Sequence, residues 1–195
     1  MKRFIDLYCS NLEKHQIISQ EQTEVCAYGL ELLLSGLINI FILVLCSFIL
    51  HEEKYIFFYF LGFIPMRLFA GGYHADNHLN CCIVFAGIYV ISLCLKRFII
   101  PVSMMLFIVI EGLLVFCLSP VESPNKHLTD RRRKISRCRS IGILLCNFAI
   151  CVIYLWFQTN NTYIAYYLLS GFLASLTMIA GKIKLCIVTQ RKVSE

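Results

Sequence analysis

The sequence predicts an all-α integral membrane protein: a polytopic helical bundle with four to six membrane-embedded helices, preceded by an N-terminal amphipathic helix. Of the 195 residues, 58% are hydrophobic and only 15% are charged, whereas an average soluble domain is roughly 45–50% apolar and about 25% charged. The apolar residues also form several long runs, and a soluble domain of this length has one modest core in which to bury them. We expect a single domain over residues 1–195, since this length leaves no room for a second folded unit.

Residues 1–18 have the pattern of an amphipathic helix, because Phe4, Leu7 and Leu12 recur at helical spacing. The segment carries too many charges to span a bilayer, so we expect it to lie on the membrane surface or to pack against other helices. Residues 19–22 read Ser-Gln-Glu-Gln. This order fits a capping box and predicts the start of a new helix.

Six apolar runs follow, and each is a candidate membrane helix. They cover residues 32–50, 55–66, 81–95, 98–118, 141–157 and 163–180. A transmembrane helix needs about 20 apolar residues. The runs 55–66 and 81–95 are short enough to be re-entrant, and the predicted number of membrane-embedded helices is therefore four to six.

The main polar segment, residues 119–140, is predicted to be a basic cytoplasmic loop. Within it, Thr129 or Asp130 could cap a basic helix that starts at Arg131. With six spans, this loop and the basic C-terminal tail fall on the same side of the membrane as the N-terminus. The positive-inside rule makes that side cytoplasmic.

We therefore expect a multi-pass protein of the cell membrane, with both termini and the segment 67–82 on the cytoplasmic side. Lys96 and Arg97 fall on the opposite side, against the rule. The net charge of +6 is interpreted as topology and as contact with membrane lipid. No nucleic-acid partner is expected.

The 11 cysteines do not indicate a disulfide framework. Most of them lie inside apolar runs, where cysteine behaves as a small hydrophobic residue. The chain has no Cys-x-x-Cys pair, which argues against a structural zinc site. We expect no metal ion and no cofactor.

The segment 67–82 gathers small and polar residues between two apolar runs, and it contains histidine and cysteine together. This pair suggests a thiol nucleophile with an imidazole base. His74 and Cys81 are seven residues apart, roughly 10.5 Å along an unbroken helix, so this dyad requires a helix break between them. His78 and Cys82 are four residues apart and would meet on a regular helix. Local geometry alone slightly favours the pair of His78 and Cys82.

The same segment resembles a known family. Residues 67–75 read Arg-Leu-Phe-Ala-Gly-Gly-Tyr-His-Ala, and a cysteine follows seven residues after the histidine. This pattern is similar to the accessory gene regulator B (AgrB) family, the membrane peptidases of Gram-positive quorum sensing. The resemblance covers most of the chain, including Tyr-Gly-Leu-Glu at residues 28–31 and Ser-Pro-Asn-Lys at residues 123–126. Two departures are the second cysteine, Cys82, and His127, where related chains often have proline.

The resemblance implies a cysteine endopeptidase of a Gram-positive-type bacterium, with Cys81 as nucleophile and His74 as general base and acid. Its partner is a short amphipathic peptide precursor of the AgrD type. Cleavage removes the C-terminal tail of this precursor and leaves a thioester on Cys81, which an internal thiol or hydroxyl converts to a thiolactone or lactone. The family is also compatible with a homodimer.

Three further residues are expected to support the site, together with Arg67. Gly71 and Gly72 permit backbone angles that other residues avoid and allow a second chain to approach closely. Arg67 is costly at a membrane edge unless it is paired. We hypothesise a pair between Arg67 and Glu31, with Glu111 as the other acid available.

Two functions of other classes were also considered. A metal or haem membrane protein would use His74, His78 and a cysteine, because His-x3-His is a metal-binding spacing. A non-enzymatic exporter or holin-like protein would not need the histidine and cysteine residues at all. In that protein Glu111, Lys96 and Arg97 would be the polar residues of interest.

Overall fold

A computed structural model describes residues 2–73, 78–96, 100–122, 129–157 and 161–194. Within them the chain is helical and contains no strand, which confirms the predicted fold class. The helices are α1 (Lys2–Lys14), α2 (Gln20–Ile49), α3 (Glu53–Ala70), α4 (His78–Leu95), α5 (Pro101–Leu118), α6 (Asp130–Trp156) and α7 (Thr162–Ser194).

Among the described residues, three segments are long and apolar enough to cross a membrane: Gln22–Ile49, Asp130–Trp156 and Thr162–Gln190. Two shorter apolar helices, Asn80–Leu95 and Val102–Leu118, accompany them. Helix α3 has 18 residues and includes Pro65. Length alone therefore supports three spans among the described residues. Of the two shorter apolar helices, only Asn80–Leu95 corresponds to a run that was predicted to be short enough to be re-entrant.

Two predicted helix starts agree with the structure. Ser19 is the N-cap of α2, and its backbone N–H donates to the Gln22 side chain at 3.1 Å. Thr129 is the N-cap of α6, which begins at Asp130. The basic stretch is not a separate helix, because α6 continues from it into the following apolar run. Much of the predicted loop 119–140 is therefore the first turns of a long helix.

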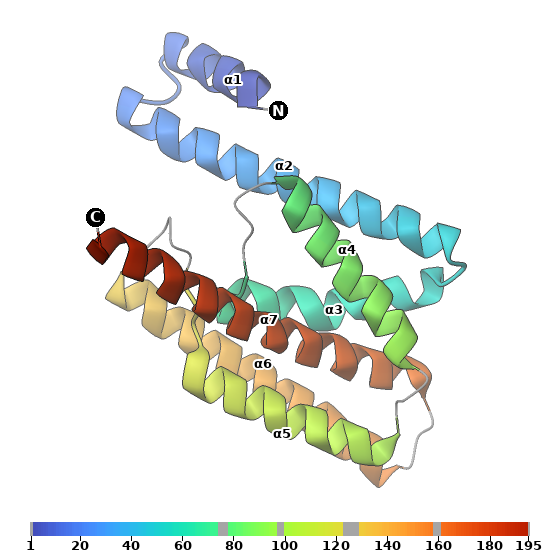
Figure 1. Ribbon diagram of the computed structural model, residues 1–195. Helices are drawn as coiled ribbons and strands as arrows, with labels where there is room; N and C mark the ends of the chain where they lie inside the picture. The colour runs from blue at the N-terminus through green and yellow to red at the C-terminus, as the bar shows by residue number, and fades with distance from the viewer. Residues whose placement is uncertain (1, 74–77, 97–99, 123–128, 158–160, 195) are drawn as a thin grey trace.

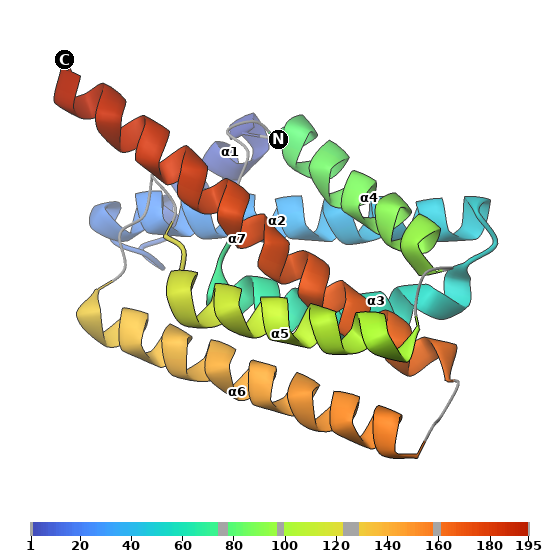
Figure 2. The same ribbon diagram turned by 60° about the horizontal axis from the view of Figure 1, so that its bottom comes forward.

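Helix α7 lies at the centre of the bundle and packs against both α3 and α5, while α6 packs against α3 and α5 from the outside (Figures 1 and 2). Helix α2 contacts α3 and α4, and α1 packs along α2. The start of α2, the start of α6 and the end of α7 lie on the left in Figure 1, and the turns that end α2 and α6 lie on the right.

An aromatic cluster fills the core between α3, α4 and α7. The ring of Tyr59 stacks on Phe63 at a centroid distance of 5.0 Å and meets Tyr89 edge-on at 5.1 Å. Tyr89 donates to the hydroxyl of Ser47 at 2.9 Å, which ties α4 to α2. These rings are buried. Aromatic pairs of this geometry add about 0.5–1.5 kcal/mol each beyond their buried area.

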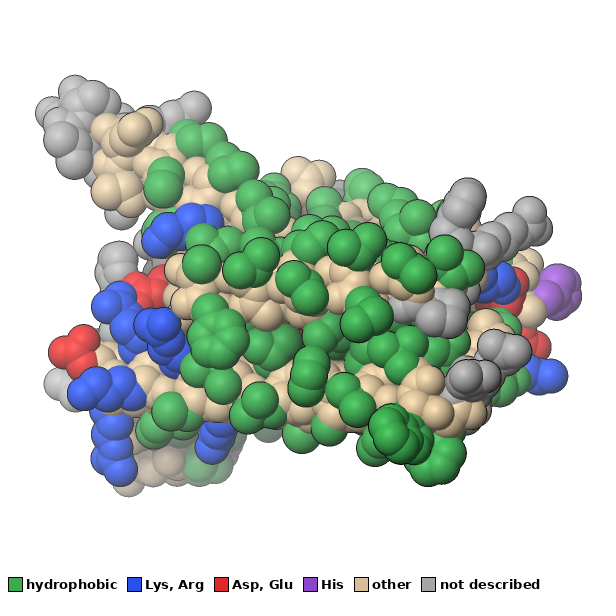
Figure 3. Space-filling model, turned by 90° about the horizontal axis from the view of Figure 1, so that it is seen from below, with side chains coloured by type: hydrophobic (Ala, Val, Ile, Leu, Met, Phe, Trp, Pro, Cys, Tyr) green, Lys and Arg blue, Asp and Glu red, His purple; other side chains and the backbone are tan. Residues whose placement is uncertain are grey.

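The surface has the polarity of a membrane protein. Hydrophobic side chains cover the middle of the face in Figure 3, many Lys and Arg side chains with a few acids gather at one end, and a smaller group of charges of both signs lies at the other end. Lys96, which conflicts with the positive-inside rule, forms an ion pair with Glu52. Its ammonium also lies 4.6 Å from the centroid of the Tyr55 ring. This pairing reduces the net positive charge at that end.

Candidate functional site

The two glycines of the 67–75 motif carry the chain out of α3 in a conformation that favours glycine. Gly71 has a φ of 81° and Gly72 a φ of 147°. Gly71 forms an isolated parallel bridge with Val121, whose N–H donates to the carbonyl of Ala70 at 2.9 Å. A Cβ on Gly71 would collide with the Val121 carbonyl oxygen. The prediction that these glycines serve unusual backbone angles and a close approach therefore agrees with the geometry.

The other side of this segment lies against α7. The N–H of Tyr73 donates to the carbonyl of Thr177 at 2.9 Å. At Gly181 a Cβ would lie 2.6 Å from the carbonyl carbon of Gly72 and 2.9 Å from the nitrogen of Tyr73. Glycine at residue 181 is thus required for the backbone of residues 72 and 73 to cross α7 at this position along the helix. Residues 71–73 are held between α7 and Val121.

Arg67, in the last turn of α3, links the motif to α7. Its Nη1 donates to Thr177 Oγ1 at 3.0 Å, and its Nη2 donates to the carbonyl of Tyr73. A Cβ on Gly72 would meet both Arg67 Nη1 and Thr177 Oγ1. Within the described part of the chain, no ion pair joins Arg67 to Glu31, so the hypothesis of that pair finds no support here.

Cys81 lies in the first turn of α4 and is half-buried. The side-chain amide of Asn39, on α2, donates to its sulfur at a distance of 4.0 Å. The guanidinium of Arg67 and the sulfur of Cys81 lie within electrostatic range of each other. Three helices therefore converge around this cysteine.

The proposed base, His74, lies outside the described residues. The distance from His74 to Cys81 is therefore not described either. Helix α3 ends at Ala70 and α4 begins at His78. Residues 74–77 between them lie outside the described part of the chain, so the predicted helix break between His74 and Cys81 stays a prediction. Among those residues, no three His, Cys, Asp or Glu side chains are grouped closely enough to hold a metal ion.

Glu111, the other acid considered for Arg67, lies elsewhere. It is buried in α5, and its Oε1 accepts a hydrogen bond from Asn147 Nδ2 at 2.8 Å. The oxygen of the Asn147 side chain accepts in turn from the Tyr167 hydroxyl at 2.6 Å. Glu111 thus belongs to a polar cluster between α5, α6 and α7. The alternative of pairing Glu111 with Arg67 was wrong.

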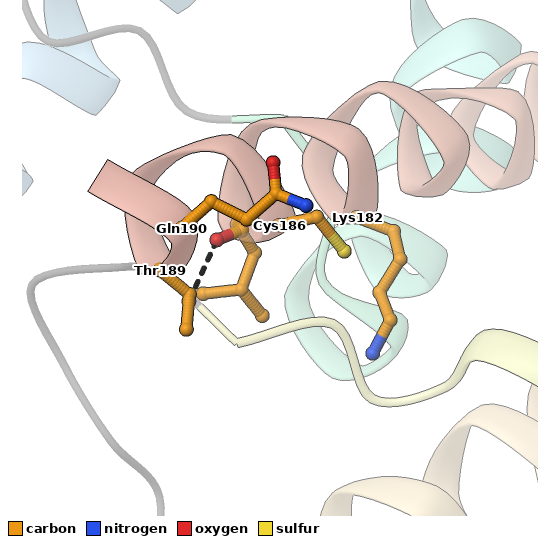
Figure 4. Close-up of a pocket in the computed structure, with 5 residues that line it drawn as sticks. Lys182, Cys186, Thr189 and Gln190 are labelled. Carbon is orange, nitrogen blue, oxygen red and sulfur yellow. Dashed lines mark hydrogen bonds between the residues drawn. The ribbon is translucent and has the colours of Figure 1, made fainter. Parts of the chain in front are cut away.

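A lysine of α7 lies on the outer side of the motif. The Lys184 ammonium lies 5.4 Å from the centroid of the Tyr73 ring. Just beyond Gly181, the last turns of α7 border a hollow of about 470 Å³, lined by Lys182, Leu185, Cys186, Thr189 and Gln190 (Figure 4). The Thr189 hydroxyl donates to the carbonyl of Leu185 at 2.8 Å, the bond dashed in the figure.

Sequence reasoning missed Asn39, Thr177, Gly181 and Val121, which all come from outside the 67–82 segment. A glycine inside the apolar helix at residue 181 was the one visible sign, since helical glycine often marks a close backbone approach.

A family model described as accessory gene regulator B matches residues 5–179 of the chain. Comparison with curated proteins finds no match. Comparison with solved structures finds none either.

Proposed function

Because the chain belongs to the accessory gene regulator B family, which takes part in quorum-sensing peptide processing, we propose that it is a membrane cysteine endopeptidase with Cys81 as nucleophile and His74 as general base. Family membership supports a protease-like role on an AgrD-type precursor. One observation supports the assignment of the site: Cys81 lies in the first turn of α4 and within electrostatic range of Arg67, whose hydrogen bonds hold the glycine segment that leads to His74.

The proposed reaction begins when His74 takes the thiol proton of Cys81. The thiolate forms at the N-terminal end of α4, where the helix macrodipole favours negative charge. It attacks a carbonyl carbon of the precursor, and the peptide C–N bond breaks after His74 returns the proton to the leaving amine. The C-terminal tail of the precursor leaves as a free peptide, and the N-terminal part remains as a thioester on Cys81.

Asn39 is proposed to stabilise the oxyanion of the tetrahedral intermediate. Its amide nitrogen lies 4.0 Å from the Cys81 sulfur, and the oxyanion forms on the carbon bonded to that sulfur. A neutral amide donor at this place is a recurring component of oxyanion holes. Arg67 already donates hydrogen bonds to Thr177 and to the Tyr73 carbonyl, so it is not the main donor to the oxyanion.

The second step is proposed to be cyclisation. A thiol or hydroxyl within the bound peptide attacks the thioester carbonyl, releases Cys81 and closes a thiolactone or lactone ring. Hydrolysis competes with this step, so the site must keep water away from the thioester. The half-burial of Cys81 between α2 and α4 supports this requirement.

The proposed location is the cell membrane of a Gram-positive-type bacterium, with the termini and the 67–82 segment on the cytoplasmic side. The family is membrane-associated, and the described residues include three helices long and apolar enough to span a membrane. The gathering of Lys and Arg at one end (Figure 3) supports this orientation.

Co-expression with the cognate precursor tests the assignment. Wild-type protein should release the tail peptide and form a covalent adduct that hydroxylamine cleaves. Cys81→Ala and His74→Ala should abolish both, whereas the matched variants Cys82→Ala and His78→Ala should keep both.

The outcomes discriminate between the alternatives. Full cleavage by Cys81→Ala refutes the proposed nucleophile. Loss of cleavage in Cys82→Ala alone moves the nucleophile by one residue and makes His78 the candidate base. Loss of activity on chelation would favour a metal-dependent reaction.

A further inference from the structure

A groove of about 830 Å³ lies between α3, α6 and α7, away from Cys81 and Arg67. Its volume falls within the range of about 300–1,000 Å³ that is usual for ligand sites. Its walls are almost wholly apolar and include Phe58, Leu61, Pro65, Ile143, Ile150 and Ile164. In a membrane-embedded bundle such a groove is filled by hydrocarbon, because its walls offer water almost no hydrogen-bond partner.

One end of the groove is positively charged. Arg139 lines it there, with its guanidinium 5.1 Å from the centroid of the Phe69 ring. Two other arginines of the same stretch are engaged elsewhere: Arg133 pairs with Glu122, and Arg137 donates to the carbonyl of Phe116 at 3.2 Å.

Among the described residues, no carboxylate forms an ion pair with Arg139, and its side chain is exposed. A guanidinium presents five N–H donors in a planar fork that matches a phosphate in a bidentate manner. The end of the groove thus offers an anion site directly beside an apolar channel.

The length of the groove fits one leaflet of a bilayer. Along α6, Arg139 and Ile150 are eleven residues apart, roughly 16 Å at the helical rise. The hydrocarbon core of a bilayer is about 30 Å thick, so one leaflet contributes about 15 Å. A chain that starts from a headgroup at Arg139 therefore reaches the bilayer centre near Ile150.

We propose that this groove binds one anionic phospholipid. The phosphate accepts hydrogen bonds from Arg139, and one acyl chain lies along α6 between α3 and α7. The site is independent of the proposed peptidase chemistry. Of the residues that line it, only Phe69 belongs to the 67–82 catalytic segment, and its ring lies against the Arg139 guanidinium.

Gly142 provides a direct way to fill the groove. It lines the groove, and a Cβ built on it meets no atom within 4 Å. A leucine at residue 142 therefore meets no clash at its Cβ, and its side chain is directed at the space proposed for the acyl chain. Leucine also has a higher helix propensity than glycine, which favours folding of the variant.

The test is native mass spectrometry of the full chain, purified in detergent and supplied with an equimolar mixture of phosphatidylglycerol and phosphatidylcholine. Wild type should retain one lipid and prefer phosphatidylglycerol about tenfold or more, because both lipids carry a phosphate but the quaternary ammonium of phosphatidylcholine is repelled by the Arg139 guanidinium. Arg139→Ala should reduce that preference by about tenfold. Gly142→Leu should remove the retained lipid of either kind.

Two matched controls accompany these variants. Arg132→Ala removes an exposed charge of the same basic stretch that does not line the groove. Gly29→Leu fills open space beside an exposed glycine of α2. Both controls should bind lipid as wild type does.

Three results would overturn the proposal. The first is an equal phosphatidylglycerol preference in Arg139→Ala and Arg132→Ala. This comparison does not depend on whether Gly142→Leu folds. The second is unchanged lipid retention in a folded Gly142→Leu. The third is one-for-one displacement of the lipid by the precursor peptide, which would make the groove a peptide-docking surface.

Discussion

Gly181 should be essential for the active site although it lies 100 residues away from Cys81 in the sequence. In Gly181→Ala the new Cβ would lie 2.6 Å from the carbonyl carbon of Gly72 and 2.8 Å from its oxygen. Ordinary contacts begin near 3.4 Å. The glycine segment and α7 must therefore separate by about 1 Å, because both contacting groups are backbone and cannot rotate away.

The expected effects on stability and on activity differ in size. Overpacking costs about 1–3 kcal/mol, and alanine recovers up to about 1 kcal/mol of helix propensity. The net loss of unfolding free energy should be about 0–2 kcal/mol. A displacement of about 1 Å in a catalytic segment can cost about 100-fold in rate, and His74 follows the displaced Tyr73 directly.

The assay is the initial rate of precursor cleavage in proteoliposomes, with thermal unfolding measured on the same preparations. Gly36→Ala is the matched control, since a Cβ there meets nothing within 4 Å. It should cleave at the wild-type rate and unfold at the same or a slightly higher temperature. A folded Gly181→Ala protein that cleaves at the wild-type rate would show that the packing of residues 71–73 between α7 and Val121 does not position the site.

Three more substitutions test the surrounding contacts. Asn39→Ala should lower kcat by about 100-fold or more with little change in KM, as removal of an oxyanion donor does; an equal rise in KM instead would contradict that role. Arg67→Ala should lower cleavage at least tenfold, whereas Thr177→Ser, which keeps the hydroxyl, should stay within about threefold of wild type. Asn147→Leu should lower the free energy of unfolding by about 1–3 kcal/mol, because it leaves Glu111 buried without its partner. Thermal unfolding checks the last prediction, and an unchanged Tm would count against it.

Hydropathy identified the helices better than it located their ends. The capping residues Ser19 and Thr129 were visible in the sequence because capping is a local interaction between neighbours. The continuation of α6 through the basic stretch and of α7 through the basic tail was not predicted. Apolar runs mark where a helix meets hydrocarbon, and a helix rich in Arg and Lys continues beyond the membrane because these residues are good helix formers.

The candidate site was predictable only where its residues are contiguous. Residues 67–81 include the glycines, Arg67 and Cys81, and their spacing indicated the family. Asn39, Thr177 and Gly181 enter the site through packing of α2 and α7, and nothing in their local sequence points to residue 81. Contacts between distant segments depend on how helices cross, which periodicity within one segment does not encode.

Arg67 shows how an arginine at a membrane edge can be held by partners other than a carboxylate. A cation at a membrane edge needs its charge neutralised and its donors satisfied, and a carboxylate does both at once. In this bundle the two tasks are divided. The carbonyl end of α3, where Arg67 lies, carries the negative pole of the helix macrodipole. The donors go to the Thr177 hydroxyl and to the Tyr73 carbonyl. Because these partners belong to α7 and to the glycine segment, the arginine fixes the height at which that segment crosses α7, which a pair with Glu31 on α2 would not do.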